Sequence, residues 1–121
     1  MYLYEYIEMC KFDNIWEEIK NIYPDQIENR GKYKKVYEKL KTLKPNKSRN
    51  LTIVIRKEFE PEEEEMYYAV KGYSEVSDEI YDISFLSWDK WLGLKVKNTI
   101  DISKKKLIAH ILWEVTYYGF E

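Results

Sequence analysis

Apolar residues in the first half of the chain recur at helical spacing. One group falls at i, i+1, i+4, i+7 and i+8, on one face of a helix; it comprises Ile15, Trp16, Ile19, Ile22 and Tyr23. Asp13 is expected to cap this helix, and Pro24 ends it because proline has no amide hydrogen. A second group predicts a helix that stops before Pro45; its members are Tyr33, Val36, Tyr37, Leu40 and Leu43. Leu3, Ile7 and Cys10 indicate a short opening helix.

After Asn50 the apolar positions alternate with polar ones, which is typical of half-buried strands. We expect the second strand to end at Gly72 and residues 60–65 to form a hairpin loop. Because the loops between the strands are short, the sequence predicts an antiparallel meander. The three runs contain Leu51, Ile53, Ile55 and Phe59, then Met66, Tyr68 and Val70, then Tyr81, Ile83 and Phe85.

Two helical segments are predicted after the strands. Residues 87–93 form one turn, with Ser87 as its cap and Gly93 at its end. A last helix starts near residues 101–103 and ends by Gly119, and its wide apolar arc indicates a central place in the core. This order predicts one α+β domain over residues 1–121. It has N-terminal helices, a three- to four-stranded antiparallel sheet and a C-terminal helix packed on the sheet.

Composition excludes several classes of protein. A chain of 121 residues with 45% hydrophobic content can bury a core as one domain. The single cysteine, Cys10, cannot form an internal disulfide, and the single histidine, His110, excludes Cys/His zinc sites. No apolar run approaches the roughly 20 residues of a membrane span, and residues 1–10 lack the basic start of a signal peptide. We therefore expect a cytoplasmic protein with no membrane partner.

Charge and aromatic content each leave two interpretations open. The net charge of −2 divides into −5 over residues 1–29, +10 over 30–57, −10 over 58–89 and +3 over 90–121. Folding either packs these blocks against one another or displays them on separate faces. Aromatic residues make up 17% of the chain, twelve of them tyrosine. Because tyrosine is amphipathic, this content either enlarges a thin core or presents an adhesive surface.

Four stretches of the sequence carry a recognisable pattern. They are Phe12-Asp13-Asn14-Ile15-Trp16, Tyr23-Pro24-Asp25, Trp88-Asp89-Lys90-Trp91-Leu92-Gly93, and Ala109-His110-Ile111-Leu112-Trp113-Glu114 with Tyr117-Tyr118-Gly119-Phe120. Together they resemble a small bacterial or phage protein family of unknown function, along nearly the whole chain. The resemblance implies a bacterial or phage cytoplasmic protein and brings no catalytic residue that could be assigned here.

His110 and Glu114 are the most suggestive chemical pair. Four residues apart on the last helix, they are neighbours on one face. A carboxylate beside an imidazole fixes its tautomer and stabilises its protonated form, as a general base requires. We favour the alternative, a buried histidine that holds the helix against the sheet, because no other catalytic motif accompanies the pair.

Aromatic residues near the C-terminus are candidates for a ligand wall or an interface anchor. In this interpretation they work as tryptophan does at the centre of protein interfaces. The alternative for the tryptophans is a lid that closes the core beside the last helix. The candidates are Trp88, Trp91, Trp113 and Tyr117.

Three charged segments are candidates for binding ions or nucleic acid. Lys104, Lys105 and Lys106 occupy the first turn of the last helix, where free amides and ammonium groups together attract anions. The alternative, which we favour, is that salt and water screen the unfavourable position of these charges. The basic block of residues 30–49 interleaves with two tyrosines, but apolar-face positions direct these rings inward, so we regard nucleic-acid binding as the less favoured interpretation. The glutamates of residues 62–65 lack the ligand spacing of a calcium loop, so we interpret them as a solubilising hairpin tip.

These observations favour a non-enzymatic protein-interaction module. Its partner is expected to be another protein or a second copy of the chain, and no cofactor or metal is expected. A ligand-binding domain or enzyme with a pocket around His110 and Glu114 is the first alternative. A nucleic-acid accessory protein that uses the basic block of residues 30–49 is the second.

Overall fold

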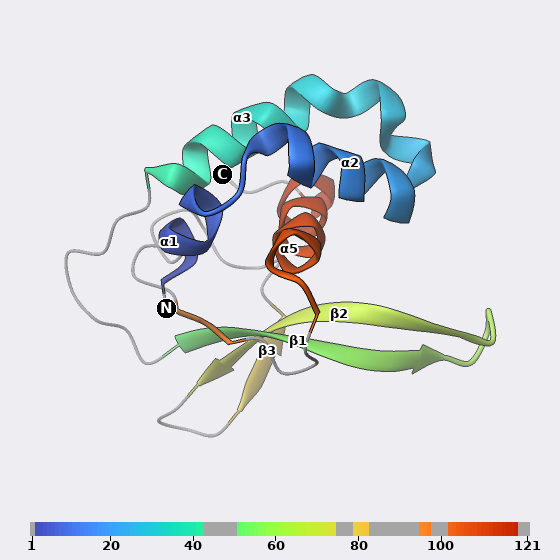
Figure 1. Ribbon diagram of the computed structural model, residues 1–121. Coiled ribbons are helices and arrows are strands. Elements are labelled where there is room, and N and C mark those ends of the chain that lie inside the picture. The colour runs from blue at the N-terminus through green and yellow to red at the C-terminus, as the bar shows by residue number, and fades with distance from the viewer. Residues whose placement is uncertain (1, 43–50, 75–78, 83–94, 98–101, 119–121) are drawn as a thin grey trace.

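The helices pack as a layer over one face of a β-sheet, as Figure 1 shows for this computed structural model. The structure describes residues 2–42, 51–74, 79–82, 95–97 and 102–118. The predicted α+β class is confirmed. The elements are α1 (Leu3–Glu8), α2 (Phe12–Ile22), the 3-10 helix η1 (Pro24–Asn29), α3 (Arg30–Lys41), β1 (Leu51–Glu60), β2 (Glu65–Ser74), β3 (Ile80–Asp82), β4 (Lys95–Lys97) and α5 (Lys104–Tyr118).

The start of α2 differs from the prediction, whereas its end agrees. The N-cap is Lys11 and not Asp13, so the helix takes in Phe12, whose ring is buried and lies 6.4 Å from that of Trp16. Burying this ring one turn before Trp16 extends the apolar face of the helix. Asp13, now inside the first turn, pairs with Arg30 at 2.7 Å. Pro24 ends α2 as expected and begins η1.

The described strands form a four-stranded mixed sheet in the order β3-β2-β1-β4. β1 and β2 form a long antiparallel hairpin, and β3 pairs antiparallel with β2. β4 lies parallel to β1, which corrects the prediction of a purely antiparallel sheet. A short hairpin loop forces antiparallel pairing, but a longer connection such as that from β3 to β4 leaves the direction to tertiary packing.

The predicted end of the second strand needs correction, and parts of the predicted third strand and following turn lie outside the described residues. β2 does not end at Gly72, which pairs with Ile53 on one side and Tyr81 on the other. The strand continues because its neighbours supply hydrogen-bond partners on both edges there. The predicted strand residues Ile83 and Phe85 and the predicted turn of residues 87–93, with Trp88 and Trp91, lie outside the described residues.

The core lies between the helix layer and the sheet. α5 occupies its centre and packs against α1, α2, α3 and β2, which agrees with its wide apolar arc. Ile53, Ile55 and Val70 form the buried face of the sheet. Tyr33 and Tyr37 are buried as expected, so part of the tyrosine content does enlarge the core. Among the described residues, no helix is both long and apolar enough to cross a membrane.

Candidate functional site

His110 is buried in the contact between α5, α2 and the sheet. Its Nδ1 lies 2.8 Å from the Tyr23 hydroxyl oxygen, so these two side chains share a hydrogen bond across 87 positions of sequence. The rings of His110 and Tyr68 lie 4.8 Å apart. Burial, and secondarily the charge of Lys106, lower the pKa of His110 to about 4. The imidazole is therefore neutral at pH 7.

The sequence left two interpretations of His110 open, a general base beside Glu114 and a buried residue that holds the helix against the sheet. In the described part of the chain, the imidazole shares its hydrogen bond with the Tyr23 hydroxyl. Burial, with a smaller contribution from the charge of Glu114, raises the pKa of Tyr23. With a neutral imidazole and Nδ1 engaged by a phenol, this arrangement supports a structural role for His110.

The Tyr23 hydroxyl should contribute measurably to stability. Tyr23→Phe leaves the ring in place but leaves the buried Nδ1 of His110 without its partner. We expect the free energy of unfolding to fall by about 1 kcal/mol, measured by urea denaturation at pH 7. Tyr67→Phe is the matched control, because its hydroxyl bonds to Glu58 at the surface and its loss should cost less than about 0.5 kcal/mol. Equal losses in the two variants would contradict the structural role of the Tyr23–His110 bond.

Trp113 and Tyr117, two of the aromatic candidates from the sequence, lie next to each other on α5. The Trp113 ring stacks on Tyr23 at 4.6 Å on one side and on Tyr117 at 4.9 Å. Trp113 is half-buried against the core, whereas Tyr117 is exposed. Stacking holds the indole in a fixed orientation at the edge of α5 that faces β2.

A groove lies between α5 and β2. It consists of two adjoining cavities, an inner one of about 180 Å³ and an outer one of about 490 Å³, and Tyr67 and Trp113 line both. We call these two cavities together the arm groove. The inner cavity is lined by Tyr67, Tyr68, Ala69, Val70, Lys71, Trp113 and Glu114, and the outer one by Glu60, Glu62, Glu63, Glu65, Tyr67 and Trp113.

Carboxylates from two elements surround Tyr67 in this groove. The Tyr67 hydroxyl donates a hydrogen bond to Glu58 Oε2 at 2.8 Å. That bond, slight desolvation, and the charges of Glu58, Glu60 and Glu114 raise the pKa of Tyr67. Lys71 brings a cation to the inner cavity, whereas the charged residues described around the outer cavity are all glutamates. The arm groove therefore becomes strongly acidic toward the hairpin tip.

The end of the β1–β2 hairpin projects past the helix layer (Figure 1). We call residues 56–68 the hairpin arm. Phe59 and Met66 face each other across its strands and are 56% and 54% exposed, and Tyr67 is 44% exposed. Sequence reasoning missed this surface because it assigned Phe59 and Met66 to the buried face of half-buried strands. The available signal was the position of Phe59 and Met66 beside the glutamate-rich turn, where little chain remains to cover them.

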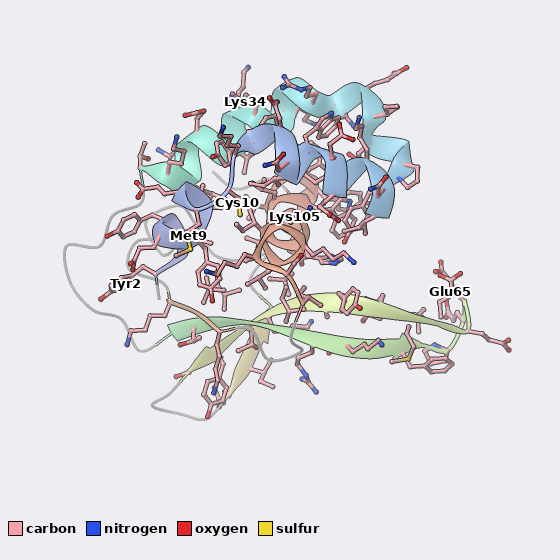
Figure 2. The ribbon with its side chains drawn as sticks, viewed as in Figure 1. Tyr2, Met9, Cys10, Lys34, Glu65 and Lys105 are labelled. Carbon is pink, nitrogen blue, oxygen red and sulfur yellow. The ribbon has the colours of Figure 1, made fainter. Side chains whose placement is uncertain are left out.

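The lysines of the first turn of α5 lie beside a second, separate hollow. Ser103 Oγ accepts a hydrogen bond from the Lys106 amide, and Lys105 pairs with Glu18 at 3.5 Å. Burial raises the pKa of Cys10, and nearby Lys104 and Lys105 oppose this rise. Figure 2 shows Cys10 and Lys105 close together among the helices, well apart from Glu65 at the hairpin tip. The hollow of about 530 Å³ is lined by Met9, Cys10, Lys11, Asn14, Ser103, Lys104 and Lys105.

The basic block is only partly described, because residues 43–50 lie outside the structure. Its lysines on α3 lie mostly at the surface, while Tyr33 and Tyr37 are buried and so cannot stack on bases. Lys34 pairs with Glu38 and also lies over the Phe12 ring. The charge blocks are thus joined in places and displayed in others: Arg30 and Asp13 link two blocks, whereas the glutamates of the hairpin tip are exposed.

The chain belongs to a protein family whose function is unknown. The family model described as "Family of unknown function (DUF6557)" matches residues 4–121, which confirms the resemblance inferred from the four sequence stretches. No curated protein and no solved structure matches the chain. Any assignment of function therefore depends on the chemistry of the surfaces described above.

Proposed function

We propose that the protein is an interaction module that binds a partner protein through the hairpin arm. The observation that carries this proposal is the exposure of Phe59 and Met66 on one face, and of Tyr67 on the other, of a projecting two-stranded arm. Aromatic residues and methionine are enriched where proteins bind one another, whereas soluble monomers keep clustered apolar side chains to small patches. Because these side chains are exposed, they contribute little to the stability of the folded protein. Binding of a partner would explain their presence on the arm.

The backbone of the arm favours binding because it is already ordered. All ten residue pairs from Leu51↔Ser74 to Glu60↔Glu65 are in register, so the arm is paired along its length. A partner that docks on an ordered surface loses less conformational entropy than one that must order a loop. The glutamates at the tip also oppose edge-to-edge aggregation, which an exposed apolar hairpin otherwise invites.

A crosslinking experiment tests this function. A photoreactive phenylalanine analogue replaces Tyr67 on the arm or, as a control, Met9, which is similarly exposed and lies far from the arm (Figure 2). Irradiation in the native cells should join a defined protein to the Tyr67 position and not to the Met9 position. The added double substitution Phe59→Ser and Met66→Ser should reduce the yield about tenfold, because it removes the apolar contacts.

Two results would contradict the proposed function. One is the same set of crosslinked proteins from both positions, which indicates random collision. The other is an unchanged yield in the double variant while circular dichroism shows the fold retained. Phe59 and Met66 are exposed, so their replacement should leave the core intact.

A further inference from the structure

We infer that the arm groove binds an extended, lysine- or arginine-rich segment of a partner protein. This inference rests on the proposed function and names the chemistry of the partner. It follows from one juxtaposition: carboxylates of the hairpin arm and of α5 border a groove that has Tyr67 and Trp113 at its middle.

Charge is the first reason for a basic partner. Among the residues that the structure describes, four glutamates line the outer cavity and no basic residue does. Cationic side chains entering there would relieve the mutual repulsion of the carboxylates. Exposed pairs of this kind contribute modestly to affinity, but they steer association and reject acidic partners.

The aromatic residues supply the second reason. Lysine and arginine have long apolar stems that pack on aromatic surface while the charged end reaches a carboxylate. At the boundary of the two cavities Tyr67 offers its ring, and Trp113, whose ring stacks on two tyrosines, offers the edge of its indole. The Trp113 ring stacks on both Tyr23 and Tyr117, which keeps it in place. The indole therefore loses little conformational freedom on binding.

The dimensions of the groove favour an extended segment over a helix. The inner cavity is about 180 Å³, whereas a helix with its side chains is roughly 10–12 Å across. β3 pairs with β2 only over Lys71–Tyr73, so among the described strands none lies beside the outer edge of β2 from Glu65 to Val70. An extended chain there could add backbone hydrogen bonds to β2. The basic helix α3 of a second copy fits this shape poorly.

Lys71 determines at which end of the groove the basic residues of the partner lie. It is the basic residue of the inner cavity, where Glu114 is the acidic one, so the net charge of the lining there is close to zero. The described lining of the outer cavity carries four glutamates and no cation. We therefore expect the lysines and arginines of the partner to lie toward the hairpin tip and neutral residues to lie beside Lys71.

Peptide titration tests the inference. The probes are three synthetic peptides in which valine alternates with lysine, with glutamate or with serine, added to the isotope-labelled protein. The lysine peptide should shift the amide signals of residues 60–71 and the Trp113 indole signal, and raising salt from about 50 to about 300 mM should weaken its binding severalfold. The glutamate peptide should not bind. Equal binding of the lysine and glutamate peptides, or shifts confined to other surfaces, would overturn the inference.

A charge-matched pair of variants separates the groove from overall charge. The groove variant carries Glu62→Gln, Glu63→Gln and Glu65→Gln, and the control carries Glu8→Gln, Glu17→Gln and Glu28→Gln at exposed positions elsewhere. The groove variant should bind the lysine peptide about tenfold more weakly, and the control less than about twofold. Equal weakening in both would mean that net charge alone attracts the peptide, and it would overturn the inference.

The outcome for this inference is distinguishable from that for the proposed function. If the Tyr67 position captures a partner whose yield the groove variant leaves unchanged, and the lysine peptide does not bind, the basic-segment inference fails while the proposed function stands. Capture that depends on Phe59 and Met66 and also on the three groove glutamates supports both. Sedimentation that shows self-association abolished only in the groove variant would overturn the inference in favour of a second copy.

Discussion

Acidification from pH 7 to pH 4.5 should destabilise the protein by about 2 kcal/mol through His110 alone. Burial lowers the pKa of this imidazole from 6.5 to about 4, with a smaller contribution from Lys106. The unfolded chain therefore takes up a proton near pH 6.5, whereas the folded protein resists it until about pH 4. Protonation favours the unfolded state across this interval, so the contribution of neutral His110 to stability is lost as the pH falls.

Urea denaturation at several pH values, compared with His110→Gln, isolates this effect from the titration of carboxylates. The variant cannot titrate at this position, so its stability should fall less between pH 7 and pH 4.5, by the same amount of about 2 kcal/mol. It should already be less stable at pH 7, because glutamine replaces a ring that packs against Tyr68. If the stability of the two proteins fell in parallel with pH, His110 would have to be exposed to solvent in the folded protein, and the prediction would be contradicted.

Leu112→Ala should cause the largest loss of stability, about 3 kcal/mol. Leu112 has no exposed surface and lies on α5, the helix that packs against α1, α2, α3 and β2. Truncation removes three carbon atoms from the centre of this packing and leaves a cavity that surrounding elements on several sides keep open. The midpoint of urea unfolding should shift to lower concentration with little change in slope.

Lys104→Ala on the same helix is the control for this prediction. Its side chain is exposed in the first turn, where a positive charge opposes the helix dipole. Its removal should change stability by less than about 0.5 kcal/mol and in the stabilising direction. Both substitutions introduce alanine, the strongest helix former, so helix propensity predicts no loss in either. A similar loss in both variants would therefore contradict the prediction that core packing sets the effect at Leu112.

Local patterns predicted most of the helices and strands because each needs only near neighbours. The apolar spacing in α2, α3 and α5 requires a buried stripe, and Pro24 cannot donate the hydrogen bond that would continue α2. β4 was not predicted because it has only three residues, of which Val96 is the buried one. A strand this short shows no alternation of apolar and polar positions. Its parallel pairing with β1 depends on residues more than forty positions away in sequence.

The candidate site was only half predictable for a similar reason. Spacing on one helix placed Trp113, Tyr117 and Glu114 on neighbouring positions, and the structure keeps them near one groove. The hydrogen bond between His110 and Tyr23 could not be predicted, because helical spacing indicates only a neighbour four residues away and not a tyrosine from another element. Tyr67 was overlooked because alternation describes the face of a strand and not whether a helix covers it.

The sequence by itself determined the α+β class, the central apolar helix and the separation of charge into blocks. These properties follow from side-chain periodicity and composition, which act within a few residues. Tertiary structure alone decided that Tyr23 meets His110, that the hairpin extends beyond the helices, and that its glutamates face α5 across a groove. Contacts between distant elements depend on how the core packs in three dimensions, and one-dimensional periodicity does not record that packing.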